Sequence, residues 1–284
     1  MNIKRIIRNS YRRFKHRIYS KLNRFSFFRQ ETLDRIGNDT ISITLQAKDH
    51  VISFSPHELI GREIYRRGQF HRSLTDRAVA ILAAENLLSG RTVLEVGANI
   101  GSQSIYLMLS GHFDRIVCIE PDARSLAFLK RNLADNKLDR KATIFDCAAG
   151  DRDGEATFHL NDGNHGGSSL IKRPDNRRAI SVPVRRIDGM LSEAGIAEEE
   201  IGFVWMDIEG GEPEALRSME NLMARRVPIL MEYSPRIYGP DRTAALIDHL
   251  AASYDRCIRF YKNSETRLAV RDMAKLAGDI LLLP

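Results

Sequence analysis

The stretch TVLEVGANIG, Thr92–Gly101, decides the fold. It joins an apolar run to a turn bounded by Gly97 and Gly101, and the next apolar run, RIVCIEP, places Glu120 nineteen residues after the second glycine. This pattern predicts a buried strand, a tight turn into a helix, and a parallel strand whose tip binds a ribose. Glycine lets the backbone approach a ligand without an intervening side chain. Together with the acid, the turn indicates an adenosine-bearing cofactor.

The charge of the turn distinguishes between the adenosine cofactors. A nicotinamide or flavin dinucleotide presents a pyrophosphate, and its usual signature is G-x-G-x-x-G. Here Glu95 precedes the glycines, and a carboxylate repels phosphate but attracts the ammonium group of S-adenosylmethionine. Asn99 offers donors and acceptors to the methionine tail. The turn therefore predicts S-adenosylmethionine as the cofactor, with contacts from Glu95, Gly97, Asn99, Gly101 and Glu120.

The charge of the chain is concentrated in its first residues. The net charge is +6, but residues 1–30 hold ten Lys and Arg and no acid, which leaves 33 basic against 37 acidic residues in the rest. The body at −4 lacks the positive excess of a nucleic-acid enzyme. A length of 284 residues suffices for one large α/β domain with additions.

Cysteine content and hydropathy indicate the compartment. Cys118, Cys147 and Cys257 are few, odd in number and widely spaced, which fits neither a disulfide framework nor a thiolate metal site. No apolar stretch approaches the roughly 20 residues needed to span a bilayer, and the basic N-terminus lacks the apolar core of a secretory signal. We expect a cytoplasmic protein, peripheral on the inner membrane face if its N-terminal arm binds lipid.

Residues 3–25 carry large apolar side chains at helical spacing among arginines and lysines. One interpretation is an amphipathic helix on an anionic membrane surface. An equally weighted one is a solvated helix that packs on the body or on a partner. The arm also resembles an organelle transit peptide. The sequence leaves these alternatives open.

Three segments are expected along the chain: a basic arm over 1–36, a cap with a hairpin and helices over 37–90, and a methyltransferase domain over 91–284. From Thr92 strands and helices alternate, which predicts a Rossmann-like α/β fold, with helices on both faces of a mostly parallel seven-stranded sheet. Asn161–Ser169 is expected to be a flexible loop. Arg256–Tyr261 and Asp279–Leu283 are expected to pair antiparallel. Asp146 and Cys147 follow the third strand, where the backbone is expected to contact adenine.

The motifs in this order resemble the FkbM family of S-adenosylmethionine-dependent methyltransferases from about Gly68 to Glu232. The matching pieces are EVGANIG (Glu95–Gly101), IEPD (Ile119–Asp122), GGSS (Gly166–Ser169), VPVRRID (Val182–Asp188), MDIEGGE (Met206–Glu212) and MEYSP (Met231–Pro235). The resemblance implies a class I methyltransferase fold and methylation of a hydroxyl on a sugar or natural product.

Three positions depart from the family pattern. Glu95 stands where members more often have Asp, which keeps the charge. Trp205 occupies a position where many carry Lys, and His71 one where members commonly have Glu. The last two departures put a lysine-dependent step in doubt and suggest a substrate that differs from the family's better-known ones.

Methyl transfer to a hydroxyl requires a base, because a neutral alcohol is a poor nucleophile. Asp207 and then Glu209 are the leading candidates, since they follow a predicted strand at the edge of the sheet where ligands bind. Capping of the next helix is the alternative for Asp207. His165, in the glycine-rich loop, is a further candidate base, with a solvated loop residue as the more frequent alternative.

Asp207, Glu209 and Glu232 would also suit Mg²⁺. Three carboxylates are equally what a hydroxyl-binding site contains, and we predict no metal.

The predicted function is an S-adenosylmethionine-dependent O-methyltransferase that acts on a hydroxyl of a carbohydrate, glycan or related natural product. One alternative is an RNA methyltransferase that uses the basic arm, although the acidic body and the lack of an evident aromatic stacking platform disfavour nucleic acid. The other is a non-catalytic cofactor-binding module that the arm tethers to a membrane surface.

Overall fold

The computed structural model describes residues 18, 25–262 and 264–284. The amphipathic helix predicted for residues 3–25 therefore lies almost entirely outside the described residues.

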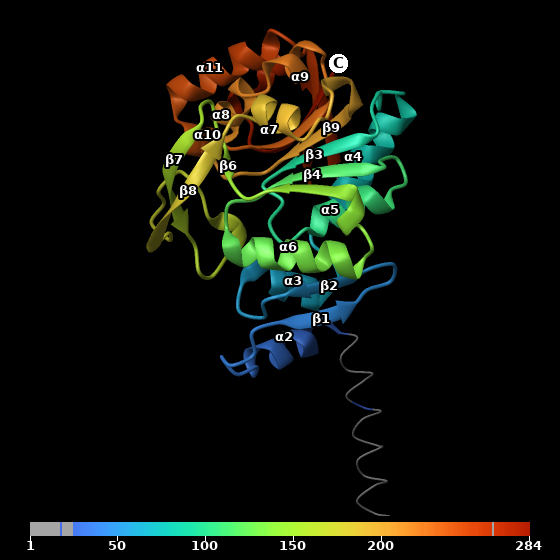
Figure 1. The fold of residues 1–284 in the computed structure, drawn as a ribbon, viewed down its shortest axis with the longest axis vertical. Coiled ribbons are helices and arrows are strands. Elements are labelled where there is room, and N and C mark those ends of the chain that lie inside the picture. The colour runs from blue at the N-terminus through green and yellow to red at the C-terminus, as the bar shows by residue number, and fades with distance from the viewer. Residues whose placement is uncertain (1–17, 19–24, 263) are drawn as a thin grey trace, which may run out of the picture.

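The core of the fold is an eight-stranded sheet in the order β12-β11-β13-β10-β9-β3-β4-β5 (Figure 1). Five adjacent strands run parallel, and β13 lies antiparallel between β10 and β11. This is the Rossmann-like arrangement that the alternating pattern predicts. The bounds are β3 Thr92–Val96, β4 Arg115–Ile119, β5 Ala142–Phe145, β9 Ile201–Met206, β10 Ile229–Tyr233, β11 Arg256–Tyr261, β12 Ser264–Ala269 and β13 Gly278–Leu283.

The predicted number of seven strands is wrong by one. The additional strand, β12, pairs with β11 at the outer edge of the sheet. Its sequence, SETRLA, is almost entirely solvent-exposed, so it carries no apolar pattern that marks a strand. The antiparallel pairing predicted for the last two apolar strands is confirmed, with Cys257 opposite Leu282.

Helices cover both faces of the sheet, and successive strand residues feed two separate cores (Figure 1). Val93 packs beneath one layer and Leu94 beneath the other, as the period-two alternation of strands requires. One layer contains α4 Arg72–Ala84, α5 Ser102–Leu109 and α6 Ala123–Asp135, and the other contains α7 Ile187–Glu193, α8 Glu212–Arg217, α9 Glu220–Ala224 and α11 Pro240–Ala251.

The segment after β9 contains two short helices, α8 and α9, and the helical conformation is interrupted at Ser218. The Ser218 hydroxyl accepts a hydrogen bond from the backbone N–H of Ile187 at 3.1 Å, and its carbonyl accepts one from the N–H of Asp188 at 3.0 Å. These bonds pair two backbone N–H groups at the start of α7. Ser218 therefore bonds α7 and does not continue α8.

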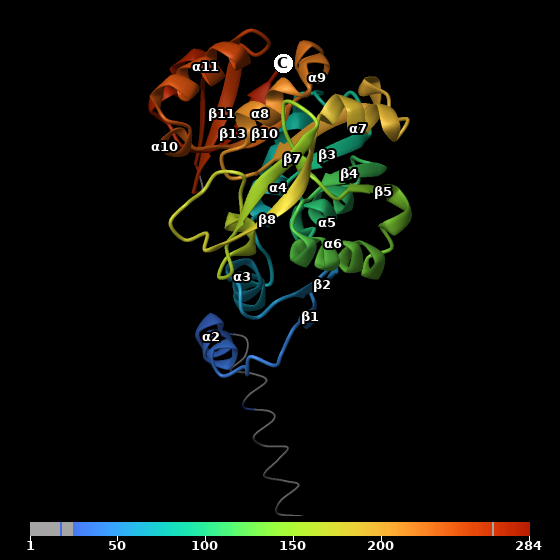
Figure 2. The ribbon, with the colours of Figure 1, turned by 60° about the vertical axis from the view of Figure 1, so that its left-hand side comes forward.

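A second, three-stranded sheet stands beside the large one (Figure 2). It consists of β6 Ala148–Ala149, β7 Gly154–Leu160 and β8 Arg178–Arg185, with β8 in the centre. Its inward side chains include Phe158 and Leu160. Five short helices lie in the connections between these elements and along the rest of the domain: η1 Asp139–Lys141, η2 His165–Gly167, η3 Glu198–Glu200, α10 Pro235–Tyr238 and η4 Val270–Lys275.

The N-terminal elements lie at the end of the molecule opposite the C-terminus (Figures 1 and 2). They are α2 Ser26–Asp34, the predicted hairpin β1 Ile43–Gln46 and β2 Val51–Phe54, and α3 Leu59–Arg67. Asn132 of α6 links this hairpin to the turn after β3. Its amide donates to the carbonyls of Ser53 at 2.9 Å and Ile100 at 2.7 Å and accepts from the Ser53 N–H at 2.7 Å.

We expect Asn132→Ala to destabilise the protein by about 3 kcal/mol, because it leaves three buried backbone groups without a partner. Urea unfolding followed by circular dichroism measures this change. Lys130→Ala, on an exposed position of the same helix, is the matched control and should change stability by less than about 0.5 kcal/mol. Equal stability of the two variants would contradict the role of Asn132.

Candidate active site

The turn after β3 packs against the ends of β4 and β9. Gly97 and Ala98 donate their N–H groups to the carbonyl of Ile119, at 2.9 and 3.1 Å. Gly97 has φ +87°, and a Cβ there would lie 2.0 Å from the carbonyl oxygen of Asp207. Only glycine allows this left-handed backbone to lie so close to another chain segment.

Glu120 fixes the backbone of the turn through hydrogen bonds to its carboxylate. Its buried carboxylate, 6% exposed, accepts the N–H of Asn99 at 2.7 Å and the N–H of Asp122 at 2.7 Å. Burial raises the pKa of Glu120 to about 7, although these two hydrogen bonds act in the opposite direction. A carboxylate offers about four acceptor positions, so two remain for ribose hydroxyls.

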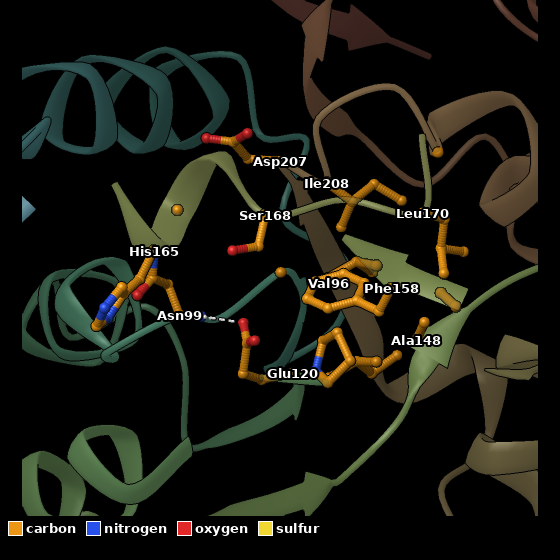
Figure 3. Close-up of a pocket in the computed structure, with 16 residues that line it drawn as sticks. Val96, Asn99, Glu120, Ala148, Phe158, His165, Ser168, Leu170, Asp207 and Ile208 are labelled. Carbon is orange, nitrogen blue, oxygen red and sulfur yellow. Dashed lines mark hydrogen bonds between the residues drawn. The ribbon is translucent and has the colours of Figure 1, made fainter. Parts of the chain in front are cut away.

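The cofactor cavity lies at the carboxyl ends of β3, β4 and β9 (Figure 3). Phe158 stands beside Val96 and Ala148 on its apolar side, and His165 lies on the opposite side (Figure 3). An apolar slot next to a carboxylate fits an adenine and its ribose. The lining residues are Val96, Gly97, Asn99, Ile119, Glu120, Pro121, Ala148, Ala149, Phe158, His165, Gly166, Ser168, Leu170, Asp207, Ile208 and Gly211.

The loop Asn161–Ser169 forms part of this cavity. The stretch is a loop, as expected, with one three-residue 3₁₀ helix, η2, and several internal hydrogen bonds, and its flexibility stays a prediction. The Ser168 hydroxyl accepts the N–H of Asn161 at 3.0 Å, and the Ser169 hydroxyl donates to the carbonyl of Glu209 at 2.9 Å. These side-chain to backbone bonds are the kind that serine and asparagine make in turns.

Four predicted cofactor residues lie outside the lining of the cavity. Glu95 is buried beneath the turn, where its carboxylate accepts a hydrogen bond from the Ser104 hydroxyl, and burial raises its pKa to about 8. Its carboxylate thus supports α5 and does not face the cavity. Gly101 faces Leu129, 2.7 Å from where its Cβ would be, and ends the turn.

Asp146 is exposed, and Cys147 points its sulfur at Met190, 3.4 Å away. The next two residues, Ala148 and Ala149, form the wall in their place. Phe158 was not predicted either, because an apolar residue in a short strand has no feature that distinguishes a ligand contact from a core position.

A second cavity adjoins the first. The two share Gly97, Asn99, Gly166 and Asp207, so Asp207 faces both. We call the second one the acceptor cavity. The positions singled out as departures from the family pattern, His71 and Trp205, both line it. Its other lining residues are Leu59, Ile60, Phe70, Ser102, Gln103, Asn164, Glu209 and Glu232.

Three carboxylates meet in the acceptor cavity. Asp207 follows β9, Glu232 lies near the end of β10, and Glu209 lies in the turn after Asp207. One oxygen of each lies within 4.8 Å of the others. The surrounding protein and the charges of Glu232 and Glu209 raise the pKa of Asp207 well above its ordinary value, and burial raises the pKa of Glu232 to about 7.

The neighbouring acids are already engaged. Arg173 donates to the Glu209 carboxylate at 2.5 Å and to its carbonyl at 2.7 Å. Glu212 accepts the N–H groups of Ile208 and Gly210 and the Tyr238 hydroxyl, at 3.1, 2.9 and 3.0 Å. The N-cap of α8 is Gly211 and no side chain caps this helix, so Asp207 does not have the capping role that was its alternative.

Asp207 itself makes no side-chain hydrogen bond within the described part of the chain. The structure therefore favours Asp207 over Glu209 as the base.

His165 belongs to the cofactor side of the site. It is half-buried, and its ring lines the cofactor cavity but not the acceptor cavity. Burial and the charge of Arg124 lower the pKa of His165, so its ring is neutral near pH 7. This position argues for a contact to the cofactor and against a base for the acceptor.

An open, mostly parallel sheet that combines an adenosine pocket with an adjoining acidic cavity defines a Rossmann-like S-adenosylmethionine-dependent methyltransferase. The methyltransferase FkbM domain matches residues 95–257, more than half of the chain. The protein therefore belongs to the FkbM methyltransferase family, as its motifs predict, and uses S-adenosylmethionine as its cofactor.

Among characterised relatives, the chain is 28% identical over 196 residues to the 2-O-methyltransferase NoeI of Sinorhizobium fredii, which covers 63% of this chain and 79% of NoeI. It also resembles the crystal structure of an FkbM methyltransferase from Methylobacillus flagellatus, with 18% identity, a TM-score of 0.46 and coverage of 78% of this chain. The chain spans only about half of that protein, 52%. An O-methyltransferase from Bacillus cereus is more distant, with 11% identity, a TM-score of 0.40, and coverage of 75% and 91%.

The three-carboxylate cluster also has a composition that suits a divalent cation. The absence of a metal stays a prediction.

We expect Glu120→Gln to weaken binding of S-adenosylhomocysteine by roughly ten- to a hundred-fold, because it removes charged hydrogen bonds to the ribose. Isothermal titration calorimetry measures the affinity. Glu220→Gln, an exposed position on α9, makes the same charge change away from the cavity and should leave the affinity unchanged. Unaltered binding by the Glu120 variant would remove this residue from the cofactor site.

Proposed function

We propose that this protein is an O-methyltransferase whose acceptor is a hydroxyl group of a carbohydrate or glycan. The observation that carries the proposal is that the cofactor and acceptor cavities meet at Asp207, a carboxylate without a hydrogen-bond partner among the described residues. The relative NoeI is named as a 2-O-methyltransferase, which agrees with transfer to oxygen.

In this proposal Asp207 acts as a general base. The cofactor, when bound, would supply an electrophilic methyl group and leave as the neutral thioether S-adenosylhomocysteine when its sulfur–methyl bond breaks. Asp207 takes the proton of the acceptor hydroxyl as the oxygen–carbon bond forms, a role worth about 10²- to 10⁴-fold in rate. The protein's other task is to hold the acceptor in line, because the reacting atoms must be about 3–3.5 Å apart. Gly97 contributes by letting the turn and Asp207 lie in contact.

The lining of the acceptor cavity suits a polyhydroxyl ligand. Asp207 and Glu232 accept hydrogen bonds, and the side-chain amides of Asn99 and Asn164 both donate and accept, with an unpartnered oxygen on each. Apolar surface comes from Trp205, which is 4% exposed, and from the rings of Phe70 and His71, which stack with centroids 4.1 Å apart. A few polar groups among aromatic walls are typical of small-molecule sites.

The charge of the cavity restricts the acceptor further. In the described structure its charged lining consists of Asp207, Glu209 and Glu232, and no lysine or arginine lines it. Carboxylates at this spacing repel an anion at close range. We infer a neutral or cationic sugar as acceptor in preference to a uronic acid or a sugar phosphate. The same repulsion disfavours the phosphodiester backbone of RNA.

Methyl-labelled cofactor tests the acceptor class. We expect label to enter neutral glycans or amino sugars in an alkali-stable linkage, as for a methyl ether, and to be absent from RNA and from uronic acid polymers. Mass spectrometry of the labelled products identifies the linkage. Trp205 is the only tryptophan in the chain, so its fluorescence reports occupation of the acceptor cavity without turnover.

Label in RNA, or label in no carbohydrate fraction while the tryptophan emission stays constant, would contradict the proposed acceptor.

We expect Asp207→Asn to lower kcat by about 10²-fold or more while the cofactor Kd changes little, since the side chain acts on the acceptor hydroxyl. In the wild type the raised pKa of Asp207 means that activity is lost at a higher pH than the ordinary pKa of an aspartate would allow, because the protonated carboxyl cannot accept a proton. Glu232→Gln removes one of the charges that raise this pKa and should move the acidic limb to lower pH by roughly half a unit to one unit.

A pH–rate profile of the wild type, of Glu232→Gln and of the Glu220→Gln control distinguishes the outcomes. A wild-type limb near pH 4, or coinciding limbs for all three proteins, would contradict the assignment of the base.

A further inference from the structure

Three phenylalanines are solvent-exposed at the start of α2. Phe25 is 63% and Phe27 66% exposed, and Phe28 follows them, with its ring 5.6 Å from that of Phe27 in an edge-on contact. Single exposed apolar residues are normal on protein surfaces. Three aromatic residues within four positions form an apolar patch, which in a folded protein indicates an interaction site.

The opposite face of α2 is anchored, so the phenylalanines point outward because of how the helix packs. Leu33 is buried, Asp34 forms an ion pair with Arg62 of α3, and Arg29 donates to the carbonyl of Tyr65 at 2.8 Å. Three side chains fix one face of this short helix to the protein. The other face, which carries the phenylalanines, therefore has a defined orientation toward solvent.

The sequence that leads into this patch is strongly basic. Residues 1–30, which include the patch, contain ten Lys and Arg and no acid, whereas the rest of the chain is at −4. In the folded part, Arg29, Lys48 and Arg67 line a cavity between α2, the hairpin and α3. Two acids also line this cavity, Asp49 and Asp76, and Arg72 pairs with both, at 2.7 and 2.8 Å to Asp49 and at 3.5 Å to Asp76. The patch therefore lies at the basic end of an otherwise acidic protein.

We propose that this end of the molecule docks on an anionic phospholipid surface, with Phe25, Phe27 and Phe28 inserted at the interface and the surrounding basic residues facing the headgroups. Aromatic side chains favour the membrane–water boundary, and basic residues are attracted by anionic lipid. The charge selects an anionic occupant, because an uncharged apolar partner does not account for ten basic residues without an acid. No helix of the described residues is long and apolar enough to span a bilayer, so the contact is peripheral.

The proposal does not depend on the nature of the methyl acceptor. α2 packs on α3, whose exposed Leu59 lies at the acceptor cavity. If α2 docks on the membrane, α3 is the helix next to it. The acceptor cavity, which Leu59 of α3 lines, would then open close to the membrane.

Co-sedimentation of the full chain with vesicles tests the docking surface. We expect binding to vesicles that contain phosphatidylglycerol, weak binding to pure phosphatidylcholine, and release when salt is raised to about 1 M, where the Debye length is only about 3 Å. The double variant Phe25→Ser/Phe27→Ser should lose about tenfold or more in affinity for the anionic vesicles. Tyr261→Ser, an exposed aromatic position on β11, is the matched control and should bind like the wild type.

Equal binding by the double variant and the wild type would overturn the assignment of the patch, because it would leave the arm's charge as the sole anchor. Binding that is equal for both lipids, or absent for both, would also overturn it. So would a dimeric wild type that becomes monomeric in the double variant, because the patch would then be an interface between copies. S-Adenosylhomocysteine affinity equal to wild type shows that the double variant is folded.

Discussion

The contact between Gly97 and the backbone of Asp207 is the constraint on which the site depends. With any larger residue at position 97, a Cβ would lie 2.0 Å from the Asp207 carbonyl oxygen and 2.9 Å from Ile208. The glycine turn after β3 and the end of β9 that carries Asp207 would then have to separate. The Asp207 N–H also donates to the carbonyl of Val96 at 3.0 Å, which continues the sheet pairing up to this point. The cofactor and acceptor cavities are adjacent because these two strand ends are in contact.

The acids around this contact have different tasks because their partners differ. Glu120 is bound by backbone N–H groups, Glu209 by Arg173, and Glu212 by backbone and the Tyr238 hydroxyl. Among the described residues Asp207 makes no side-chain hydrogen bond, Glu232 bonds only the side chain of Ser234, and the pKa values of both are raised. Such a pair is costly to keep charged in a cleft, and sites of this kind are usually functional. The cationic cofactor and an acceptor without negative charge are the ligands that reduce this cost.

The sequence predicted the elements in which local pattern and long-range structure agree. Thr92–Val96 and Arg115–Ile119 are the observed strands, and the glycine turn and Glu120 lie at the cofactor cavity. The predictions from sequence failed where the direction of a side chain determines whether a residue lines the cavity. Glu95 stands at the expected position along the chain, but its side chain turns into the protein, toward Ser104. The cavity wall expected at Asp146 and Cys147 is formed by Ala148 and Ala149, the next two residues. A motif predicts which residues lie near a ligand, but it does not predict the direction of each side chain. Phe158 reaches the cavity through the pairing of β7 with β8, a contact between distant segments that no local pattern records.

A crystal structure of the protein with bound S-adenosylhomocysteine tests the central claim most directly. The account predicts the ribose hydroxyls on Glu120, the adenine in the apolar slot beside Phe158, and the sulfur at the junction of the two cavities, facing Asp207. A nucleoside bound elsewhere, or a sulfur directed away from the acceptor cavity, would contradict it.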